Sequence, residues 1–312
     1  MRTGQLEMPK KKKSLAKKWR ENLDLWFFVL PGMVITFIFS YVPLYGLQIA
    51  FRRFSAKKGI WGSPWVGLDH FVRYFEGPYF WSTLGNTFLL SLYSLIAGFP
   101  IPIILALMLN SFRHKRYRRL IQTVTYAPNF ISTVVMAGML LLFLSPSVGI
   151  VSELLGVFGI PSVNFMAEKS LWRHIYVWSG VWQNTGWNSV IFFAALAGVS
   201  PEFHEAAIVD GASKFQRILY IDLPTILPTA TILLILNCGS ILSVGFEKAF
   251  LLQNDLNLSV SEIISTYTYK VGLVQNDMSY STAIGLFNSV INAVLLVIVN
   301  WTADKLSGTS LW

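Results

Sequence analysis

Five residues that lie within apolar stretches of this sequence have side chains suited to binding a polar ligand. Four of them fall within two helical turns and the fifth lies further along the chain: Gln183, Asn184, Trp187, Asn188 and Asn237. Side-chain amides donate and accept hydrogen bonds, so they can pair with the hydroxyl groups of a sugar. An indole offers a flat apolar surface for the C–H face of a pyranose ring. The sequence therefore predicts a ligand path here. Packing between helices is the alternative, because amides also join membrane helices to one another.

Residues 200–224 lie between two apolar stretches and carry the local signals of a helix that begins and ends sharply. Ser200 can cap a helix whose first residue is Pro201, because the missing N–H of proline costs nothing at that position. Asp210 and Gly211 are expected to end this helix, since glycine readily adopts the positive φ found at many helix ends.

A second short helix is expected directly afterwards. Ser213 and Gln216 form the pattern of a capping box, and Leu223-Pro224 is expected to end the helix. A mere connector needs neither this length nor two capped helices. The first helix has a small apolar face that can seat in a groove of a soluble partner: Phe203, Ala206 and Ala207.

The elements that position these residues are membrane helices. The chain has 312 residues, of which 54% are hydrophobic and only 13% are charged, whereas soluble domains are about a quarter charged. Six apolar stretches each approach the roughly 20 residues that a helix needs to cross a bilayer. They are Leu25–Ile49, Asn86–Leu109, Gln122–Leu144, Ile175–Val199, Thr225–Gly245 and Thr282–Trp301. The predicted fold is an all-α integral membrane protein with six transmembrane helices.

The distribution of basic residues predicts the orientation of these spans, because cytoplasmic loops are enriched in Lys and Arg. With the N-terminus inside, the inner segments hold 16 of these residues and the outer segments hold nine. Both termini are therefore expected in the cytoplasm, and residues 200–224 lie on the cytoplasmic side between spans four and five. The basic clusters adjoin apolar runs, which favours contact with membrane lipids and argues against binding of nucleic acid.

Other functional classes lack their sequence signals. No GxxxxGK[ST] loop is present to hold ATP, and His204-Glu205 does not complete a zinc motif because position 208 is Ile. An ion-coupled secondary transporter or a channel is the better rival. Such proteins often place ionisable residues near the middle of the membrane, and these spans have none near their centres.

The segment of residues 200–224 also matches a known motif at fixed spacing. The matching residues are Glu205, Ala206, Ala207, Gly211, Ile221, Leu223 and Pro224. In this respect the chain resembles the permease subunits of binding-protein-dependent ABC importers, whose EAA loop has this pattern. The variant Glu-Ala-Ala-x-x-Asp-Gly-Ala, with Asp210 before Gly211, is similar to that of the carbohydrate-uptake branch, and more specifically of importers of complex oligosaccharides.

The resemblance implies a division of labour between subunits. It implies a basic cytoplasmic tail over residues 1–24 and a permease domain over 25–312. The implied partners are a second homologous permease, two cytoplasmic ATPases that hold ATP and Mg²⁺, and an extracytoplasmic solute-binding protein. This chain would be no enzyme, would have no cofactor of its own, and would pass an oligosaccharide, acidic or neutral, across the cytoplasmic membrane. The residues implied to couple it to the ATPase are Glu205, Ala206, Ala207, Asp210, Gly211, Leu223 and Pro224.

Overall fold

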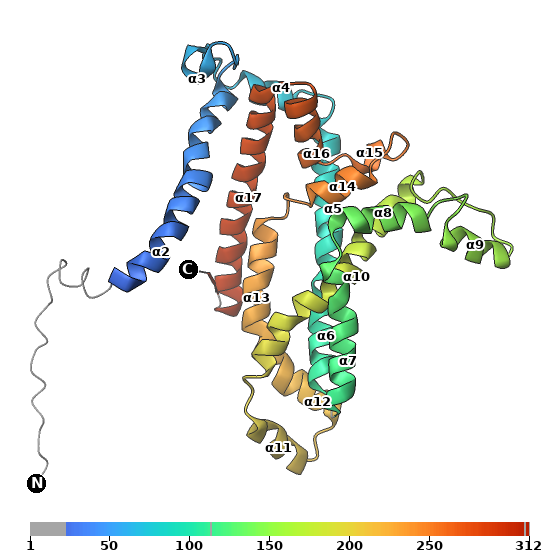
Figure 1. The fold of residues 1–312 in the computed structure, drawn as a ribbon. Helices are drawn as coiled ribbons and strands as arrows, with labels where there is room; N and C mark the ends of the chain where they lie inside the picture. The colour runs from blue at the N-terminus through green and yellow to red at the C-terminus, as the bar shows by residue number, and fades with distance from the viewer. Residues whose placement is uncertain (1–22, 113, 309, 312) are drawn as a thin grey trace, which may run out of the picture.

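The computed structural model describes residues 23–112, 114–308 and 310–311, and the regular elements in these ranges are helices (Figure 1). The predicted tail of residues 1–24 therefore lies almost entirely outside the described residues. In chain order, the elements are α2 (Leu23–Thr36), η1 (Phe37–Tyr41), η2 (Val42–Phe51), α3 (Gly59–Gly62), α4 (Asp69–Phe75), α5 (Phe80–Gly98), α6 (Pro100–Asn110), α7 (Lys115–Tyr126), η3 (Ala127–Phe130), α8 (Thr133–Phe143), α9 (Ile150–Val157), α10 (Lys169–Leu196), α11 (Pro201–Val209), α12 (Lys214–Arg217), η4 (Ile218–Asp222), α13 (Leu223–Gly239), α14 (Phe246–Leu252), α15 (Leu258–Ser261), α16 (Ile264–Tyr269), η5 (Lys270–Val274) and α17 (Met278–Ser307).

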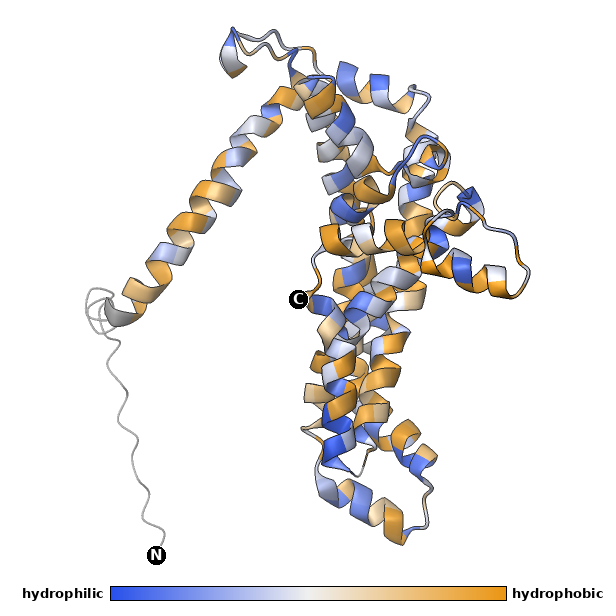
Figure 2. Ribbon diagram, turned by 45° about the vertical axis from the view of Figure 1, so that its right-hand side comes forward, coloured by the Kyte–Doolittle hydropathy of each residue, from blue (hydrophilic) through white to orange (hydrophobic). Residues whose placement is uncertain are grey.

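Four continuous helices in the described part of the chain are long and apolar enough to cross a membrane, and a bent pair gives a fifth candidate. The four are Leu25–Phe51, Phe80–Asn110, Lys214–Gly239 and Met278–Lys305. Figure 2 shows hydrophobic residues along most of the length of the long helices. The chain is thus an all-helical membrane protein, as its composition predicted. Its described part has four or five helices that qualify as membrane spans by length and hydropathy, whereas the sequence predicted six.

The third predicted stretch, Gln122–Leu144, is not one straight helix. Helices α7 and η3 meet α8 at an angle of 96°. Pro128 lies in the 3-10 turn at the end of the first part, and Ser132 then caps α8 by accepting a hydrogen bond from the backbone N–H of Val135. A proline that removes a backbone donor and a serine that starts a new helix together explain the bend.

The fourth predicted stretch, Ile175–Val199, corresponds to α10, which begins earlier, at Lys169, and ends at Leu196. Its 28 residues correspond to about 42 Å at 1.5 Å per residue. The helix is not among the membrane candidates, because the amide side chains of Gln183, Asn184 and Asn188 lower its mean hydropathy.

The expectation that Leu223-Pro224 ends a helix is wrong. Helices α12, η4 and α13 form one continuous membrane candidate, Lys214–Gly239. The turn before Pro224 is a π-helix in which the N–H of Leu223 bonds the carbonyl of Ile218. A π-helical turn changes the local hydrogen-bond pattern, and the helix passes a residue that has no N–H to donate.

The two ends of the molecule differ in the segments that they carry. Figure 1 shows α11 and α12 at one end, near the start of α7, and α3, α4 and α16 at the other. Helix α2 leans away from the other helices in both ribbon views, while η2 packs on α17. Segments with the same predicted membrane side therefore lie at the same end.

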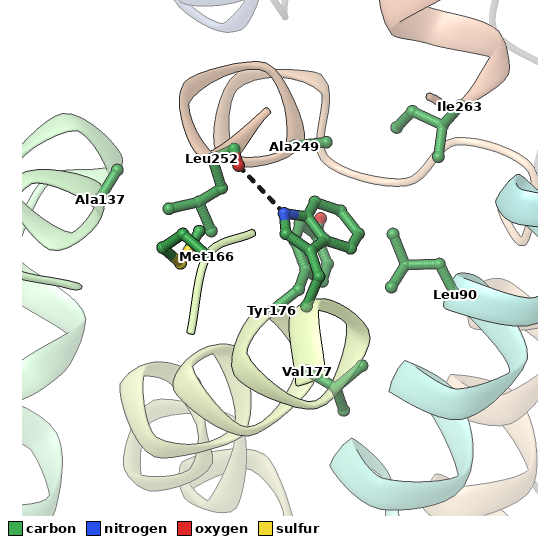
Figure 3. Close-up of a cluster of buried hydrophobic side chains, with 9 residues drawn as sticks. Leu90, Ala137, Met166, Tyr176, Val177, Ala249, Leu252 and Ile263 are labelled. Carbon is green, nitrogen blue, oxygen red and sulfur yellow. Dashed lines mark hydrogen bonds between the residues drawn. The ribbon is translucent and has the colours of Figure 1, made fainter. Parts of the chain in front are cut away.

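A buried cluster fixes α10 against α14 and neighbouring segments (Figure 3). The indole N–H of Trp172 donates to the carbonyl of Leu252 over 3.0 Å, and the ring of Trp172 stacks on that of Tyr176. Ala249 and Leu252 of α14 join the same cluster. This packing sets the position of α14 relative to α10.

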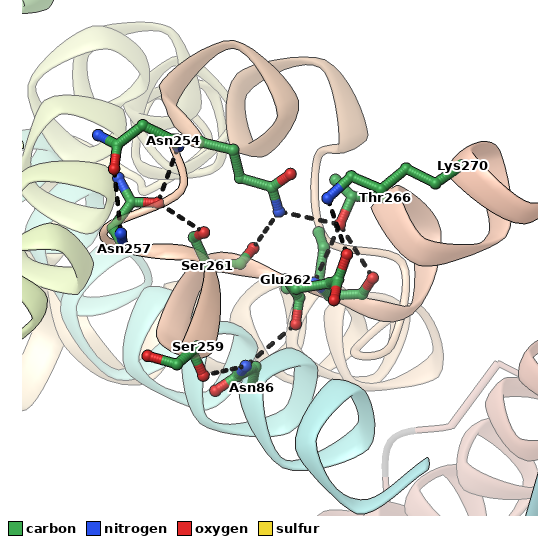
Figure 4. A network of polar contacts seen from close by, with 10 residues as sticks. Asn86, Asn254, Asn257, Ser259, Ser261, Glu262, Thr266 and Lys270 are labelled. Carbon is green, nitrogen blue, oxygen red and sulfur yellow. Dashed lines mark hydrogen bonds and ion pairs between the residues drawn. The ribbon is translucent and has the colours of Figure 1, made fainter. Parts of the chain in front are cut away.

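A polar network holds residues 259–270 on α5 (Figure 4). Asn86 donates to the carbonyls of Ser259 and Glu262 over 3.0 and 3.1 Å. The Glu262 carboxylate pairs with the Lys270 ammonium at 2.8 Å. Buried polar groups that are hydrogen-bonded in this way make an irregular segment rigid.

Candidate functional site

A cavity of about 950 Å³ lies between α5, α6, α10 and α13, with the η3–α8 bend and residues 240–248 completing its wall. Ligand cavities in proteins commonly span about 300–1,000 Å³. All five residues predicted to form a ligand path line this one cavity: Gln183, Asn184, Trp187, Asn188 and Asn237. The structure thus brings together side chains from two helices that the sequence could place only on separate stretches.

Two of the four amides among these residues are engaged in packing. Gln183 is buried, and its Nε2 donates to the carbonyl of Ile131 over 2.8 Å, at the bend before α8. Asn184 donates to the carbonyl of Gly180 and accepts from Asn129. These hydrogen bonds favour the packing alternative for Gln183, whose amide N–H holds the bend against α10.

The other three residues are more available to a ligand. Trp187 is 53% exposed, and its ring makes an edge contact with that of Phe130. Asn188 and Asn237 are exposed, and the amide of Asn237 donates to the carbonyl of Leu233 one turn earlier. Exposed amides beside an exposed indole can meet hydroxyl groups and a sugar ring face without losing a structural partner.

Lys248 also lines the cavity, and sequence reasoning missed it. Its ammonium donates to the carbonyl of Tyr176 over 2.7 Å and lies 4.8 Å from the centre of the Tyr176 ring. The residue is 8% exposed, and burial lowers the pKa of its amine to about 8. No sequence signal marked it, because its burial depends on the packing of α14 against α10.

The segment of residues 200–224 has the predicted local structure at its start. The hydroxyl of Ser200 accepts the N–H of Glu202, and Pro201 is the first residue of α11. Gly211 has φ +77°, its N–H bonds the carbonyl of Ile208, and the N–H of Ala212 bonds that of Ala207. This is a Schellman ending, which requires the left-handed conformation at the glycine.

The second helix of this segment begins as predicted. Ser213 and Gln216 form a reciprocal capping box, with distances of 2.7 and 3.3 Å. The two helices are therefore separated by a defined turn.

Helix α11 turns most of its motif residues to the solvent. Glu205, Ala206 and Asp210 are exposed, whereas Ala207 is half-buried. Large apolar side chains are exposed on the same helix: Phe203 at 64%, Ile208 at 55% and Val209 at 86%. An exposed apolar patch of this kind is typical of a surface that contacts another protein or a membrane. Pro224 is also exposed and Leu223 is half-buried, further along at the start of α13.

A polar contact that the motif did not predict joins α11 to the membrane helices. Nε2 of His204 lies 3.2 Å from Oδ1 of Asp222, and Nδ2 of Asn110 donates to the same oxygen over 3.3 Å. The Asp222 side chain is only 3% exposed. Its carboxylate therefore connects α11, the end of α6 and the start of α13. The signal in the sequence was an acidic residue at the edge of an apolar stretch.

The sequence as a whole matches a known family over residues 98–308, which is more than half of the chain. The matched family is the binding-protein-dependent transport system inner membrane component. The chain belongs to this family. The resemblance inferred from residues 205–224 is thereby confirmed, and it favours an ATP-driven importer over an ion-coupled transporter or a channel.

Relatives and solved structures extend this likeness over nearly the whole chain. Protein LplB of Bacillus subtilis (strain 168) is 41% identical, over 90% of this chain and 89% of that protein. The polygalacturonan/rhamnogalacturonan transport system permease protein YteP of the same strain is 38% identical, over 95% and 92%. A chain of a bacterial alginate ABC transporter, solved with an alginate pentasaccharide-bound periplasmic protein, is 37% identical with a TM-score of 0.87, over 96% of this chain and all of that one.

Several properties follow directly from membership of this family. This permease is a multi-pass protein of the inner membrane and works with a binding protein and the other subunits of an ABC transporter. Hydrolysis of ATP belongs to a separate subunit, so this chain is not an enzyme and holds no cofactor of its own.

Proposed function

We propose that this permease passes an acidic oligosaccharide, received from an extracytoplasmic binding protein, through the cavity beside α10 and α13. The observation that carries the proposal is the cavity wall, where exposed amides lie beside an exposed indole: Asn188, Asn237 and Trp187. The acidic class is supported by YteP and by the alginate transporter, whose names refer to uronate-containing polymers.

Uptake measurements test this function. The complete complex with its binding protein is reconstituted into liposomes loaded with ATP, and uptake of labelled oligogalacturonate and alginate oligosaccharides is compared with that of neutral xylo- and arabino-oligosaccharides. Uptake of an acidic oligosaccharide is the expected result. Uptake restricted to neutral oligosaccharides would refute the acidic class while leaving the importer assignment in place.

The proposed topology has six spans, with both termini in the cytoplasm. It adds α10 and the bent α7–α8 pair to the four continuous candidates. The length of α10 and its contacts with α5, α6 and α13 support a transmembrane position, since its polar face then borders the cavity instead of lipid. The permease domain of residues 25–312 contains all of these helices.

A second, homologous permease subunit is proposed to complete the membrane part of the complex. No residue in the most hydrophobic part of the span Leu25–Phe51 is buried within this chain. Large side chains along this span are exposed, such as Phe28 at 80% and Phe39 at 74%. Both observations support a partner subunit. In Figure 1 the first part of this span, α2, stands apart from the other helices. A partner subunit together with lipid can cover such a helix.

The complex is proposed to contain two cytoplasmic ATPases, one of which binds α11 and the turn at Gly211 of this chain. The apolar side chains of α11 are exposed, and Glu205 on the same helix offers an anion to a basic or amide group of the partner. Glu205, Ala206, Ala207, Asp210 and Gly211 would form the contact, and Leu223 and Pro224 would carry the motion into α13.

A further inference from the structure

Lys248 places a positive charge in the wall of the proposed substrate cavity. Among the residues that line it, the acidic and basic side chains are those of Glu247 and Lys248. Glu247 is exposed, whereas Lys248 is 8% exposed. In the described part of the chain, no carboxylate lies within ion-pair distance of the Lys248 ammonium.

The ammonium is only partly satisfied by its protein partners. A lysine has three N–H donors, and the structure shows one of them donating to the carbonyl of Tyr176, with the aromatic ring of Tyr176 beside it. A buried charge is unfavourable unless it is paired. The cavity therefore contains a cation whose natural complement is an anion that comes from outside this chain.

The position of this cation is set by α10. Tyr176, Gly180, Asn184 and Asn188 recur every four residues, so they lie along one face of this helix, and all four line the cavity. A Cβ atom at Gly180 would lie 3.3 Å from Nζ of Lys248, so the absence of a side chain there makes room for the ammonium. The charge thus lies at one end of the row of amides.

This arrangement matches the chemistry of a uronic acid residue, which carries hydroxyl groups on its ring and one carboxylate. We infer that Lys248 binds the carboxylate of a uronate residue while Asn188 contacts the ring hydroxyl groups of the same oligosaccharide. The inference rests on the proposed function and assigns the charge recognition to one residue. Because burial lowers the pKa of Lys248 only to about 8, the amine keeps most of its charge at neutral pH.

The packing alternative is that Lys248 merely connects α14 to α10 through the Tyr176 carbonyl. Under that alternative, replacement of Lys248 would weaken the complex toward every substrate alike. Binding of a carboxylate predicts a loss that depends on the charge of the ligand. The two explanations therefore differ in ligand selectivity, which can be measured.

The test uses the complete membrane complex in nanodiscs, without the binding protein, so that selectivity of the binding protein does not enter. The probes are trigalacturonate and its methyl ester, which has the same ring hydroxyl groups but no charge. Binding is measured by calorimetry for the wild type and for Lys248→Met, Lys248→Arg and Glu247→Gln. Lys248→Met is expected to bind the acid at least about tenfold more weakly, because hydrogen bonds to charged groups are among the strong ones. Its affinity for the ester should stay within about twofold.

The variants separate the outcomes. Lys248→Arg should retain the preference for the acid, since arginine is also a cation that pairs with carboxylates. Glu247→Gln should not reduce it. Equal losses of affinity for acid and ester in Lys248→Met would support the packing alternative. An unchanged preference for the acid in Lys248→Met would overturn the inference, and so would a wild type that does not bind the acid. Uptake of oligogalacturonate by the wild-type complex in liposomes tests the proposed function separately.

Discussion

Trp187 is the residue whose role in the cavity can be tested with the least disturbance of the fold. Its indole is 53% exposed and lines the cavity, so truncation removes little buried surface. Truncation of a fully buried tryptophan would instead destabilise a protein by about 3–5 kcal/mol. Trp187→Ala should therefore lower oligosaccharide uptake severalfold while the amount of assembled complex and its basal ATPase rate stay unchanged.

The matched control for this substitution is Trp172→Ala. Trp172 is fully buried and donates to the carbonyl of Leu252, so its truncation should reduce assembly of the complex itself. Uptake and assembly are measured on the same preparations. If Trp187→Ala also reduces assembly, the indole serves packing and not the sugar path.

His204 offers a second test at the scale of a single side chain. His204→Ala removes the contact between α11 and the buried Asp222 carboxylate, which keeps its hydrogen bond from Asn110. Loss of one hydrogen bond to a buried acceptor typically costs about 1–3 kcal/mol. We expect ATP hydrolysis to continue while uptake per ATP falls, because motion of α11 is transmitted less firmly to α6 and α13.

His204→Gln is the control, since its amide can still donate to the carboxylate. Uptake and ATP hydrolysis are measured together in liposomes. A normal ratio of uptake to hydrolysis in His204→Ala would show that this contact does not transmit motion.

At the scale of elements, the end of α11 depends on the backbone of Gly211. Its φ is +77°, and an added Cβ atom would meet no atom within 4 Å. Within this chain, a substitution at this position is therefore unfavourable only through the backbone. The left-handed conformation costs most residues other than Gly, Asn and Asp roughly 1–2 kcal/mol. Gly211→Val should weaken co-purification of the ATPase, and Gly211→Pro should do so more strongly, because it also removes the N–H that bonds Ile208.

Gly211→Asn is the matched control, because asparagine tolerates the left-handed conformation. It should retain most ATPase binding if conformation is what matters. Normal ATPase binding in Gly211→Pro would mean that this turn is not part of the docking surface. A loss in Gly211→Asn equal to that in Gly211→Val would indicate that the ATPase packs directly against the bare glycine.

At the scale of the whole molecule, the six-span topology predicts which surface positions face each side. Lys58 and Arg116 are both exposed, on segments proposed to lie outside and inside. In a Cys238→Ser background, Lys58→Cys should react with a membrane-impermeant maleimide in intact cells, and Arg116→Cys should react only after the membrane is opened. The reverse pattern would refute the orientation. Ser63, although on the same outer segment as Lys58, is buried at 2% and would be a poor probe.

The sequence by itself determined the features that depend on neighbours in the chain. Composition and the length of apolar runs identified a membrane protein, because a bilayer demands apolar side chains over a fixed distance. The caps of α11 and α12 and the positive φ of Gly211 followed from residues within a few positions of each other. The family motif lay in the same short segment, so it could be recognised without knowledge of the fold.

Tertiary structure alone decided the features that depend on distant segments. Packing of α10 against α13 made one cavity wall from Trp187 and Asn237, and packing of α14 against α10 buried the charge of Lys248. The 96° bend before α8 and the helix that continues through Pro224 also departed from local expectation. A hydrogen bond from Gln183 stabilises the bend and a π-helical turn accommodates the proline. Apart from the π-helical turn, which is local, these contacts join residues far apart in the sequence, and local patterns do not encode which of them will meet.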